Sequence, residues 1–263
     1  MYRNPGIPRL TLSAIVASLL SIPTFGVTAM AFSDSTAVPD LTLNGSARVL
    51  ATPNGRSVIL LTPAKQSRAG SAFTTNSIVF NPRYTFRTFF QFQMTDPGAQ
   101  GAADGMTFVL QTESANALGG DGGSLGYMGI TPSVAVEFDT WQNAGDINGN
   151  HVAILTDGQL NDIDPQTPYG VTNCQPSAGV FGCMSNGDLW SVWIDYDGRS
   201  LNMAIADNST ERPANLISQP IDLLRILGQN SAFAGFTAGT GSALQNHIIV
   251  DWFISAPTDS EEQ

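Results

Sequence analysis

The amino-acid sequence predicts an all-β protein, built as a single antiparallel β-sandwich. Short segments in which every second residue is apolar recur between clusters of Gly, Pro, Asn and Asp. This pattern is typical of strands joined by turns. After residue 31, no amphipathic helix of ordinary length is indicated. The roughly 232 residues that follow residue 31 contain no internal repeat and no dividing linker, and their length fits one large β domain.

Individual strands are expected where residues two apart are apolar. Such runs occupy residues 86–94, 106–110, 190–196, 201–205 and 247–255. Asp197-Gly198 separates two of these runs and predicts a hairpin turn. Residues 221–227 fit either one helical turn or a short irregular strand.

The first 31 residues are organised as a secretory signal peptide. Arg3 and Arg9 precede an apolar run over about 10–27, and residues 29–31, Ala-Met-Ala, form a small-x-small cleavage signal. Serines and Pro23 interrupt the run short of the roughly 20 apolar residues that a membrane span needs. The sequence therefore predicts cleavage after residue 31, no membrane span and a secreted or periplasmic protein.

The mature sandwich domain is expected over residues 32–256, with a polar acidic tail over 257–263. The chain carries 11 Lys and Arg against 22 Asp and Glu, a formal net charge of −11. Such a chain lacks the basic surface that nucleic acid or an anionic membrane requires. Bound cations would neutralise part of its charge.

Cys174 and Cys183 are the only cysteines. Cysteine pairs of exported proteins form disulfides under oxidising conditions. A structural Cys174–Cys183 disulfide is therefore predicted, and the spacing does not fit a CxxC redox pair.

The segment 134–143, Val-Ala-Val-Glu-Phe-Asp-Thr-Trp-Gln-Asn, is the most informative part of the chain. Side chains of a strand alternate between its two faces. Val134, Val136 and Phe138 therefore share one face, and Glu137, Asp139 and Trp141 share the other. Two carboxylates on one face repel each other unless a cation lies between them, so the pattern indicates a metal site.

Two kinds of metal site can be built here. Asp139, Asn143, Asp146 and a backbone carbonyl form an all-oxygen set suited to Ca²⁺. Glu137 and His151, sharing the two aspartates, form a mixed nitrogen and oxygen set suited to Mn²⁺ or a similar transition metal. The alternative is an acidic strand edge with a surface histidine.

Three further segments have the composition of site loops. Residues 101–105 carry Asp104 among small residues, 118–126 are rich in glycine, and 239–246 form a polar loop between apolar strands. Glycine allows a ligand to approach the backbone closely. Each segment has an alternative interpretation. Asp104 could be an ordinary turn residue, 118–126 a flexible or tightly turned loop, and 239–246 a loop exposed to solvent.

Together these residues resemble a legume-type (L-type) lectin domain, over roughly residues 33–256. Val136-Glu-Phe-Asp-Thr-Trp-Gln-Asn143, followed by Asp146 and His151, matches the metal strand of that family. The other similar motifs are Ala103-Asp-Gly-Met-Thr-Phe-Val-Leu110, Gly123-Ser-Leu-Gly126, Leu43-Asn-Gly-Ser-Ala47, Gly235-Phe-Thr-Ala-Gly-Thr-Gly241, Gln245-Asn-His247 and Asp251-Trp252.

The resemblance implies a jelly-roll, concanavalin-A-like sandwich and two adjacent metal ions. Ca²⁺ would be held by Asp139, the Trp141 carbonyl, Asn143 and Asp146. The transition ion would be held by Glu137, Asp139, Asp146 and His151, together with waters. The family also implies a cis peptide bond at Ala103–Asp104.

This chain departs from the family at one point. Only two residues separate Asn143 from Asp146, where plant members usually have four. The calcium loop is therefore tighter, and Asn148 or Asp157 is an alternative to Asp146 as a ligand.

The resemblance implies a binding protein for glycans, without catalysis. Asp104 would accept sugar hydroxyls, Asn143 and the Gly123 N–H would donate to sugar oxygens, and Trp141 would stack on the pyranose ring. A specificity loop is expected to contribute Thr240, Gly241, Ser242, Ala243 and Leu244. A shallow site of this kind gains avidity from several copies, and a homo-oligomer is one way to provide them.

Two other classes of protein remain open. A laminarinase-like glycoside hydrolase carries Glu-x-Asp-x-x-Glu, but here the third position is Gln142, and retaining hydrolysis needs a second carboxylate. A structural or adhesive sandwich without sugar binding is also compatible with the fold, since a fold does not fix function.

Overall fold

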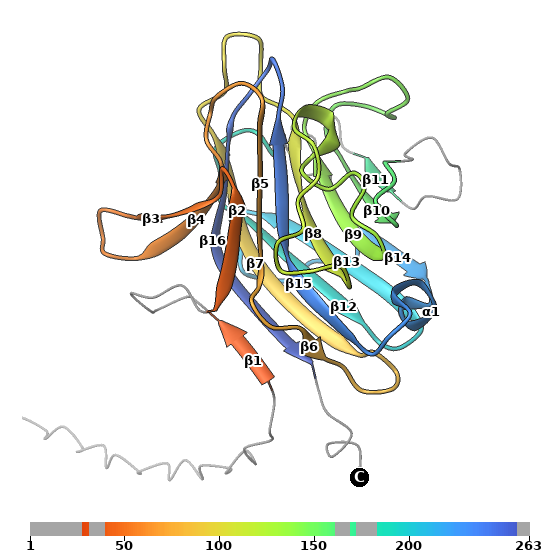
Figure 1. Cartoon of the computed structure of the whole chain (residues 1–263). Helices are drawn as coiled ribbons and strands as arrows, with labels where there is room; N and C mark the ends of the chain where they lie inside the picture. The colour runs from red at the N-terminus through yellow and green to blue at the C-terminus, as the bar shows by residue number, and fades with distance from the viewer. Residues whose placement is uncertain (1–27, 32–39, 161–168, 172–182, 257–263) are drawn as a thin grey trace, which may run out of the picture.

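The computed structural model describes residues 28–31, 40–160, 169–171 and 183–256. Two antiparallel sheets of eight strands each lie face to face (Figure 1). The predicted all-β sandwich is confirmed. We name the two layers sheet A and sheet B.

Sheet A contains the longest strand among the described residues, β16, which has 11 residues. In spatial order it consists of β14 (Ile217–Pro220), β13 (Ser200–Asp207), β12 (Trp190–Tyr196), β7 (Phe86–Thr95), β16 (Asn246–Ala256), β4 (Ser57–Thr62) and β3 (Arg48–Ala51), with β1 (Thr28–Ala31) also paired to β16. The predicted hairpin at Asp197-Gly198 joins β12 to β13, because Tyr196 is paired with Leu201 across the turn.

Sheet B carries the acidic strand. In spatial order it consists of β11 (Tyr169–Val171), β10 (His151–Thr156), β9 (Ser133–Asp139), β8 (Gly105–Gln111), β15 (Ser231–Thr240), β5 (Arg68–Thr74) and β2 (Leu41–Gly45), with β6 (Ile78–Val79) also paired to β15. The register of β9 and β10 places His151 opposite Asp139.

Aromatic side chains fill the space between the sheets. The Phe90 ring of sheet A lies 5.9 Å from Phe108, 5.8 Å from Phe138 and 4.9 Å from Phe236 of sheet B, measured between ring centroids. All four residues are buried. Burial of large apolar rings is the main stabilising contribution in such a core.

A second, smaller apolar cluster lies on the outer face of sheet B. It contains Val109, Ala135 and Leu155 of the strands together with Tyr127 and Ile130 of the segment between β8 and β9. This segment therefore covers the sheet, and β8 and β9 are buried along their whole length.

Residues 221–227 contain one short helix, α1 (Leu223–Leu227). Asp222 caps it by accepting a hydrogen bond from the Arg225 N–H at 3.0 Å, and Gly228 ends it with φ of +72°. Of the two structures predicted for this segment, the helical turn is the one formed. A second short helix, the 3₁₀ turn η1 (Gly122–Ser124), lies in the segment that covers sheet B.

Several predictions concern the ends of the chain and segments outside the described residues. β1 pairs antiparallel with Phe253–Ala256, so these backbone positions of the predicted signal peptide lie along sheet A. The cleavage position stays a prediction, as do the domain boundaries and the acidic tail. Cys174 lies outside the described residues, and the Cys174–Cys183 disulfide likewise stays a prediction. Among the described residues, no helix has the length and hydropathy to cross a bilayer.

Candidate functional site

Four loops meet at one end of the sandwich, drawn at the top of Figure 1. Leu244 donates its N–H to the Gly101 carbonyl at 3.2 Å, which joins the 239–246 loop to the loop before β8. Asp104 donates its N–H to the Gly239 carbonyl at 3.1 Å and accepts at its own carbonyl from the Thr140 N–H at 2.8 Å. Segments separated by more than a hundred residues therefore form one surface.

Asp104 lies at the centre of these loops. The Ala103–Asp104 peptide bond is cis, as the resemblance implied. Asp104 is only 5% exposed, and its Oδ2 has no hydrogen-bond partner among the described residues. Burial raises the pKa of this carboxyl to about 6, against a lowering contribution from a backbone hydrogen bond of Gly241 and a raising one from the charge of Asp121. Asp104 is thus a buried acceptor that can still receive a ligand hydrogen bond.

A chain of buried polar side chains supports the Asp104 backbone from below. The Thr140 hydroxyl donates to the Asp104 carbonyl at 2.8 Å and accepts from Gln245 Nε2 at 2.7 Å. Gln245 Nε2 lies 3.1 Å from His247 Nε2, and His247 Nδ1 lies 2.6 Å from the Thr62 hydroxyl. Full burial lowers the pKa of His247 to about 3, so the imidazole is neutral.

Three predicted metal ligands lie together beside Asp104. Glu137, Asp139 and His151 are buried, and each offers a ligand atom within 4.8 Å of the others. Glu137 and Asp139 come from β9, and His151 from the start of β10. The alternative of an acidic edge with a surface histidine is wrong, because His151 is fully buried.

The hydrogen bonding of His151 indicates which ring nitrogen can bind a metal. Nδ1 lies 2.9 Å from the Asn148 carbonyl, an acceptor, so Nδ1 carries the proton. Nε2 then presents its lone pair toward Glu137 Oε2, 3.8 Å away. Such a backbone carbonyl partner is the usual support of a metal-binding histidine.

Asn143 and Asp146 lie against the same cluster. Glu137, Asp139, Asn143 and Asp146 all line one cavity of about 330 Å³. The Trp141 N–H donates to Asp139 Oδ1 at 2.7 Å, and the Asn143 N–H donates to Asp146 Oδ2. Asp146 therefore reaches the cavity even though this loop is two residues shorter than in most plant members of the family.

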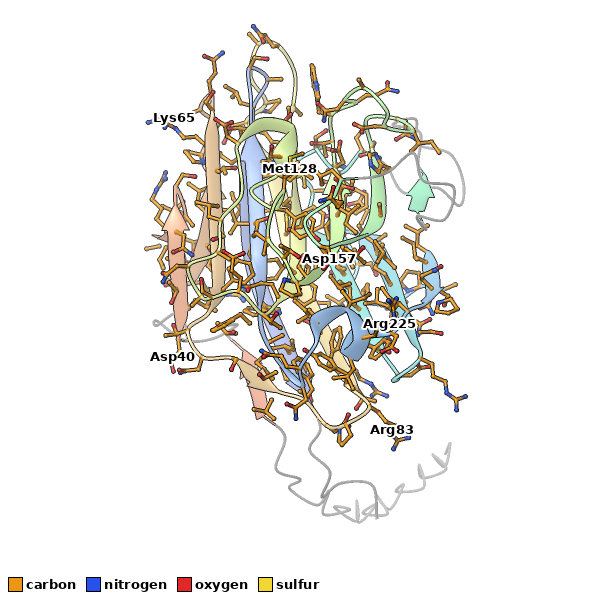
Figure 2. All side chains as sticks on the ribbon, turned by 45° about the vertical axis from the view of Figure 1, so that its right-hand side comes forward. Asp40, Lys65, Arg83, Met128, Asp157 and Arg225 are labelled. Carbon is orange, nitrogen blue, oxygen red and sulfur yellow. The ribbon has the colours of Figure 1, made fainter. Side chains whose placement is uncertain are left out.

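Of the alternatives to Asp146, Asp157 is excluded by its place in the fold. It follows Thr156, which pairs with Val134 at the opposite end of β9 from Asp139. Figure 2 shows Asp157 below Met128, a residue of the cavity wall. Asn148 uses its side-chain oxygen to accept from the Asn150 N–H at 2.8 Å.

These donors fit the two predicted ions. Carboxylates, an amide and a carbonyl are ligands that Ca²⁺ prefers, and an imidazole with carboxylates suits a transition ion. Buried carboxylates without a cation are costly, and no Lys or Arg lines the cavity. The donor set is therefore compatible with a Ca²⁺ and a transition-metal ion.

Gly123, Asn143 and Trp141 frame the opening above Asp104. A Cβ added to Gly123 would lie 2.8 Å from Asn143 Nδ2, so only glycine fits here without displacing Asn143. Trp141 is 36% exposed and its ring approaches Gly101, whose added Cβ would lie 3.4 Å from Cζ3. Trp141 is thus a surface aromatic rather than a core residue.

The predicted specificity loop is divided between two environments. Gly241 lies against Asp104, because a Cβ at Gly241 would lie 3.3 Å from Oδ2. Ala243 is buried, Leu244 packs on Gly98, and Ser242 is exposed. Thr240 is fully buried, and its hydroxyl is used by the turn between β4 and β5. The contact of Thr240 with sugar stays a prediction. In the structure its hydroxyl donates to the Lys65 carbonyl.

Sequence reasoning missed the polar chain of Thr62, Thr140, Gln245 and His247. It also missed the β4–β5 turn, which touches the specificity loop. Polar residues inside apolar runs, such as Thr62 and His247, are the signal that could have found the chain, since buried polar groups need partners.

The protein is therefore a β-sandwich that carries, beside an exposed tryptophan, a buried cluster of carboxylates and a histidine that could hold a metal ion. A family model described as the legume lectin domain matches residues 27–263. The chain belongs to the legume lectin family.

Similar proteins agree with this assignment. The L-type lectin-domain containing receptor kinase I.8 of Arabidopsis thaliana is 31% identical over 234 residues, which is 82% of this chain and 34% of that protein. The lectin-like protein At3g16530 of the same plant is 28% identical over 204 residues, 70% of this chain and 74% of that protein. The chain thus spans about a third of the receptor kinase.

Solved structures of similar fold include plant lectins. Peanut lectin with a nine-residue peptide superposes with a TM-score of 0.69 at 24% identity, covering 88% of this chain and 97% of that one. Basic winged bean lectin with Tn-antigen gives a TM-score of 0.69 at 25% identity, covering 87% and 98%. The jelly-roll sandwich is therefore shared with these lectins.

Proposed function

We propose that this protein binds glycans at the Asp104 site, as a lectin without catalytic activity. The observation that carries the proposal is the Asp104 carboxylate, which is buried but has an oxygen with no hydrogen-bond partner among the described residues. Leaving such an acceptor unsatisfied costs free energy. Sugar hydroxyls are donors that would satisfy it.

Each residue around Asp104 would supply one part of recognition. Asp104 would accept two hydroxyl protons in charge-assisted hydrogen bonds. The Asn143 amide and the Gly123 N–H would donate to a sugar oxygen, and the Trp141 ring would pack on the C–H face of the pyranose. The backbone around Gly241 would close the side of the site.

The chain's own hydrogen bonds would hold this arrangement ready for ligand. Thr140 fixes the Asp104 carbonyl, and Gln245 fixes Thr140. A bound Ca²⁺ and transition ion would neutralise the carboxylates of the 139–151 loop. Asp139, the Trp141 carbonyl, Asn143 and Asp146 would hold the first ion, and Glu137, Asp139, Asp146 and His151 the second.

Secretion belongs to the same proposal. Glycans presented outside cells are reached only by an exported protein, and residues 1–31 have the organisation of a signal peptide. Self-association of several copies would raise the avidity of a weak, shallow site.

A glycan array tests the proposal. The mature protein is applied with Ca²⁺ and Mn²⁺, and again with EDTA, beside the variants Asp104→Asn and Asp40→Asn. Asp40 is exposed and lies at the opposite end of the molecule from Lys65 (Figure 2), so it is a control for the same chemical change. We expect binding by the wild type and Asp40→Asn, and none by Asp104→Asn or with EDTA.

Other outcomes would point to other functions. Metal binding without any glycan signal would favour a structural or adhesive sandwich. Slow loss of an arrayed β-glucan would favour hydrolysis. Equal binding by Asp104→Asn and the wild type would exclude the Asp104 site.

A further inference from the structure

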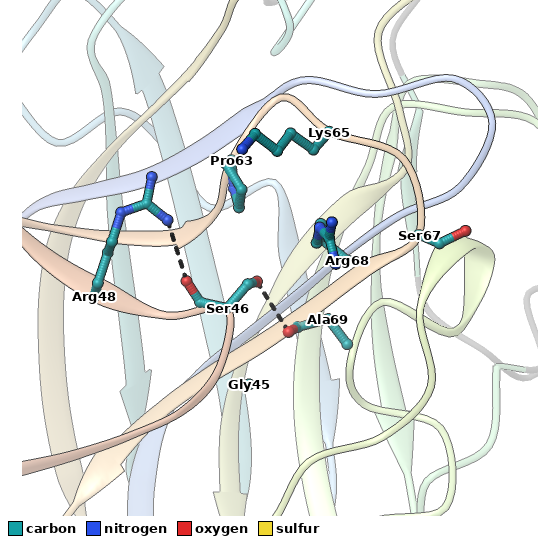
Figure 3. A pocket seen from close by; sticks show the side chains of 8 residues that line it. All are labelled: Gly45, Ser46, Arg48, Pro63, Lys65, Ser67, Arg68 and Ala69. Carbon is teal, nitrogen blue, oxygen red and sulfur yellow. Dashed lines mark hydrogen bonds between the residues drawn. The ribbon is translucent and has the colours of Figure 1, made fainter.

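A pocket of basic residues lies beside the specificity loop. It has a volume of about 390 Å³ and is lined by Ser46, Arg48, Lys65, Ser67 and Arg68, among others (Figure 3). We call it the basic pocket. It is formed where the chain crosses between the two sheets twice, from β2 to β3 and from β4 to β5.

The charge of the basic pocket is opposite to that of the protein. The chain has a formal net charge of −11 with only 11 Lys and Arg, and Lys65 is its single lysine. Three of these cations nevertheless line one pocket. In Figure 3 the Lys65 side chain runs from the turn toward Pro63 and Arg48. Like charges brought together repel one another, so the arrangement favours an anionic ligand.

No carboxylate compensates these charges within the described part of the chain. Ion pairs in that part of the chain include Arg212 with Asp195 and His151 with Glu137, which lie outside the basic pocket. Arg48 donates only to the Ser46 carbonyl, at 3.5 Å. The nearby carboxylate of Asp96 accepts from Asn246 instead.

The backbone that carries Lys65 and Arg68 is held firmly. Thr240 donates its hydroxyl to the Lys65 carbonyl at 2.7 Å and accepts from the Arg68 N–H at 3.1 Å. Ala64 donates its N–H to Asn246 Oδ1 at 2.6 Å. The buried hydroxyl of Thr240 therefore fixes the turn, and the cations project from a defined position.

The same turn is joined to the Asp104 site. The Ser67 N–H donates to the Gly241 carbonyl at 3.1 Å, and Gln66 Nε2 donates to the Ser242 carbonyl at 3.2 Å. Gly241 also lies against Asp104 Oδ2. Gly241 therefore contacts both the β4–β5 turn and the Asp104 carboxylate, which places the turn beside the Asp104 site.

We propose that the basic pocket is a second subsite, which binds the carboxylate or sulfate group of an acidic saccharide while a neighbouring sugar occupies the Asp104 site. This inference rests on the proposed glycan binding. Guanidinium groups bind oxyanions in paired hydrogen bonds, and an ammonium group adds a point charge. Without such a pocket, an acidic protein repels an acidic glycan.

Matched pairs of oligosaccharides test the inference. Each pair has one neutral member and one carrying a uronate or sulfate, and both are offered to the metal-loaded mature protein. We expect the wild type to bind the acidic member about tenfold more tightly, the effect of roughly one charge-assisted contact. The variant Lys65→Gln/Arg68→Gln should lose this preference and keep its affinity for the neutral member.

The control removes the same charge elsewhere. Arg199 and Arg225 are exposed and do not line the basic pocket, and Figure 2 shows Arg225 far from Lys65. Arg199→Gln/Arg225→Gln should keep the preference. Equal loss in this control would mean that net charge decides the preference, which overturns the proposed subsite.

Competition with inorganic sulfate separates the subsite from general salt effects. At constant ionic strength, sulfate should reduce binding of the acidic member and spare the neutral one. Equal reduction of both would overturn the subsite. Binding of neutral glycans without acidic preference overturns the subsite alone, whereas binding of no glycan overturns the proposed function as well.

Discussion

The two sheets of the sandwich use their outer faces in different ways. In β7 of sheet A, buried and more exposed residues alternate from Phe86 to Thr95, so one face packs in the core and the other is open. In β8 and β9 of sheet B, every residue is buried. The difference arises because the segment between β8 and β9 folds back over sheet B and forms a second apolar cluster there.

The covered sheet is also the one that carries the site. The covering segment brings Gly123 against Asn143, and β9 and β10 supply Glu137, Asp139 and His151. Side chains packed on both faces of a sheet are held as closely as in any protein interior. Sheet B thus carries the candidate site residues on strands packed on both faces, whereas sheet A packs against it through one face.

The largest expected effect concerns the two faces of β7. Phe90 is fully buried among rings of sheet B, whereas Phe89 is half-buried on the outer face beside Trp193, 5.3 Å away. Phe90→Ala should lower the free energy of unfolding by about 3–5 kcal/mol. Phe89→Ala should lower it by roughly 1 kcal/mol, the size of an aromatic pair contribution. Urea unfolding measures both, and equal losses would contradict the assignment of inner and outer faces.

The next effect concerns ions on sheet B. If Glu137 and its neighbours bind metal, Ca²⁺ and Mn²⁺ should stabilise the wild type by about 2.7 kcal/mol at a hundred times their dissociation constants. Glu137→Gln should lose the Mn²⁺ contribution, and thermal unfolding with and without EDTA measures it. Glu113→Gln is the control, since Glu113 is exposed and outside the cavity. Equal metal stabilisation of the wild type and Glu137→Gln would reject this ligand.

A third prediction concerns His247, a residue of sheet A that supports the site. Its pKa is about 3 in the folded protein and about 6.5 when unfolded. The unfolded chain therefore binds more protons between these values, and stability should fall as pH drops below 6.5, by at most about 1.4 kcal/mol per pH unit. Asp104 acts in the opposite direction between pH 3.8 and about 6, because its folded pKa is raised.

Comparison of the wild type with His247→Gln isolates the histidine. Urea unfolding at pH 7 and pH 5, in EDTA so that metal release plays no part, should show a flatter pH dependence for the variant. An unchanged pH dependence would mean that His247 does not stay neutral in the folded protein.

The smallest expected effect concerns the segment that covers sheet B. The Tyr127 hydroxyl lies 2.9 Å from the Ser133 hydroxyl and accepts from the Gly158 N–H at 3.1 Å. Tyr127→Phe should cost about 1 kcal/mol of stability and also weaken glycan binding, because the same segment carries Gly123. Tyr196→Phe, which removes a hydrogen bond to the Ile221 carbonyl from β12 of sheet A, should cost a similar amount and leave binding unchanged. If glycan binding fell equally in both variants, the segment that covers sheet B would have no special role in supporting the site.

Much of the fold follows from local patterns in the sequence. The alternation of 86–94 and 190–196 and the Asp197-Gly198 turn predict strands that the structure contains. Side-chain parity also separates Phe138, in the core, from Glu137 and Asp139, at the metal cluster. These features depend on neighbours close in the chain, and so the sequence displays them directly.

Local sequence patterns are sufficient to predict the strands, the faces of their side chains and the residue types suited to metal and sugar. The pairing of distant strands, by contrast, brings Asp146 rather than Asp157 to the cavity, since strand register sets that position. It also lets Thr240 hold the basic turn, and lets Thr62 meet His247 across 185 positions of the chain. Such contacts depend on which strands pair and how the sheets pack, and most of the polar groups buried in this way find a hydrogen-bond partner.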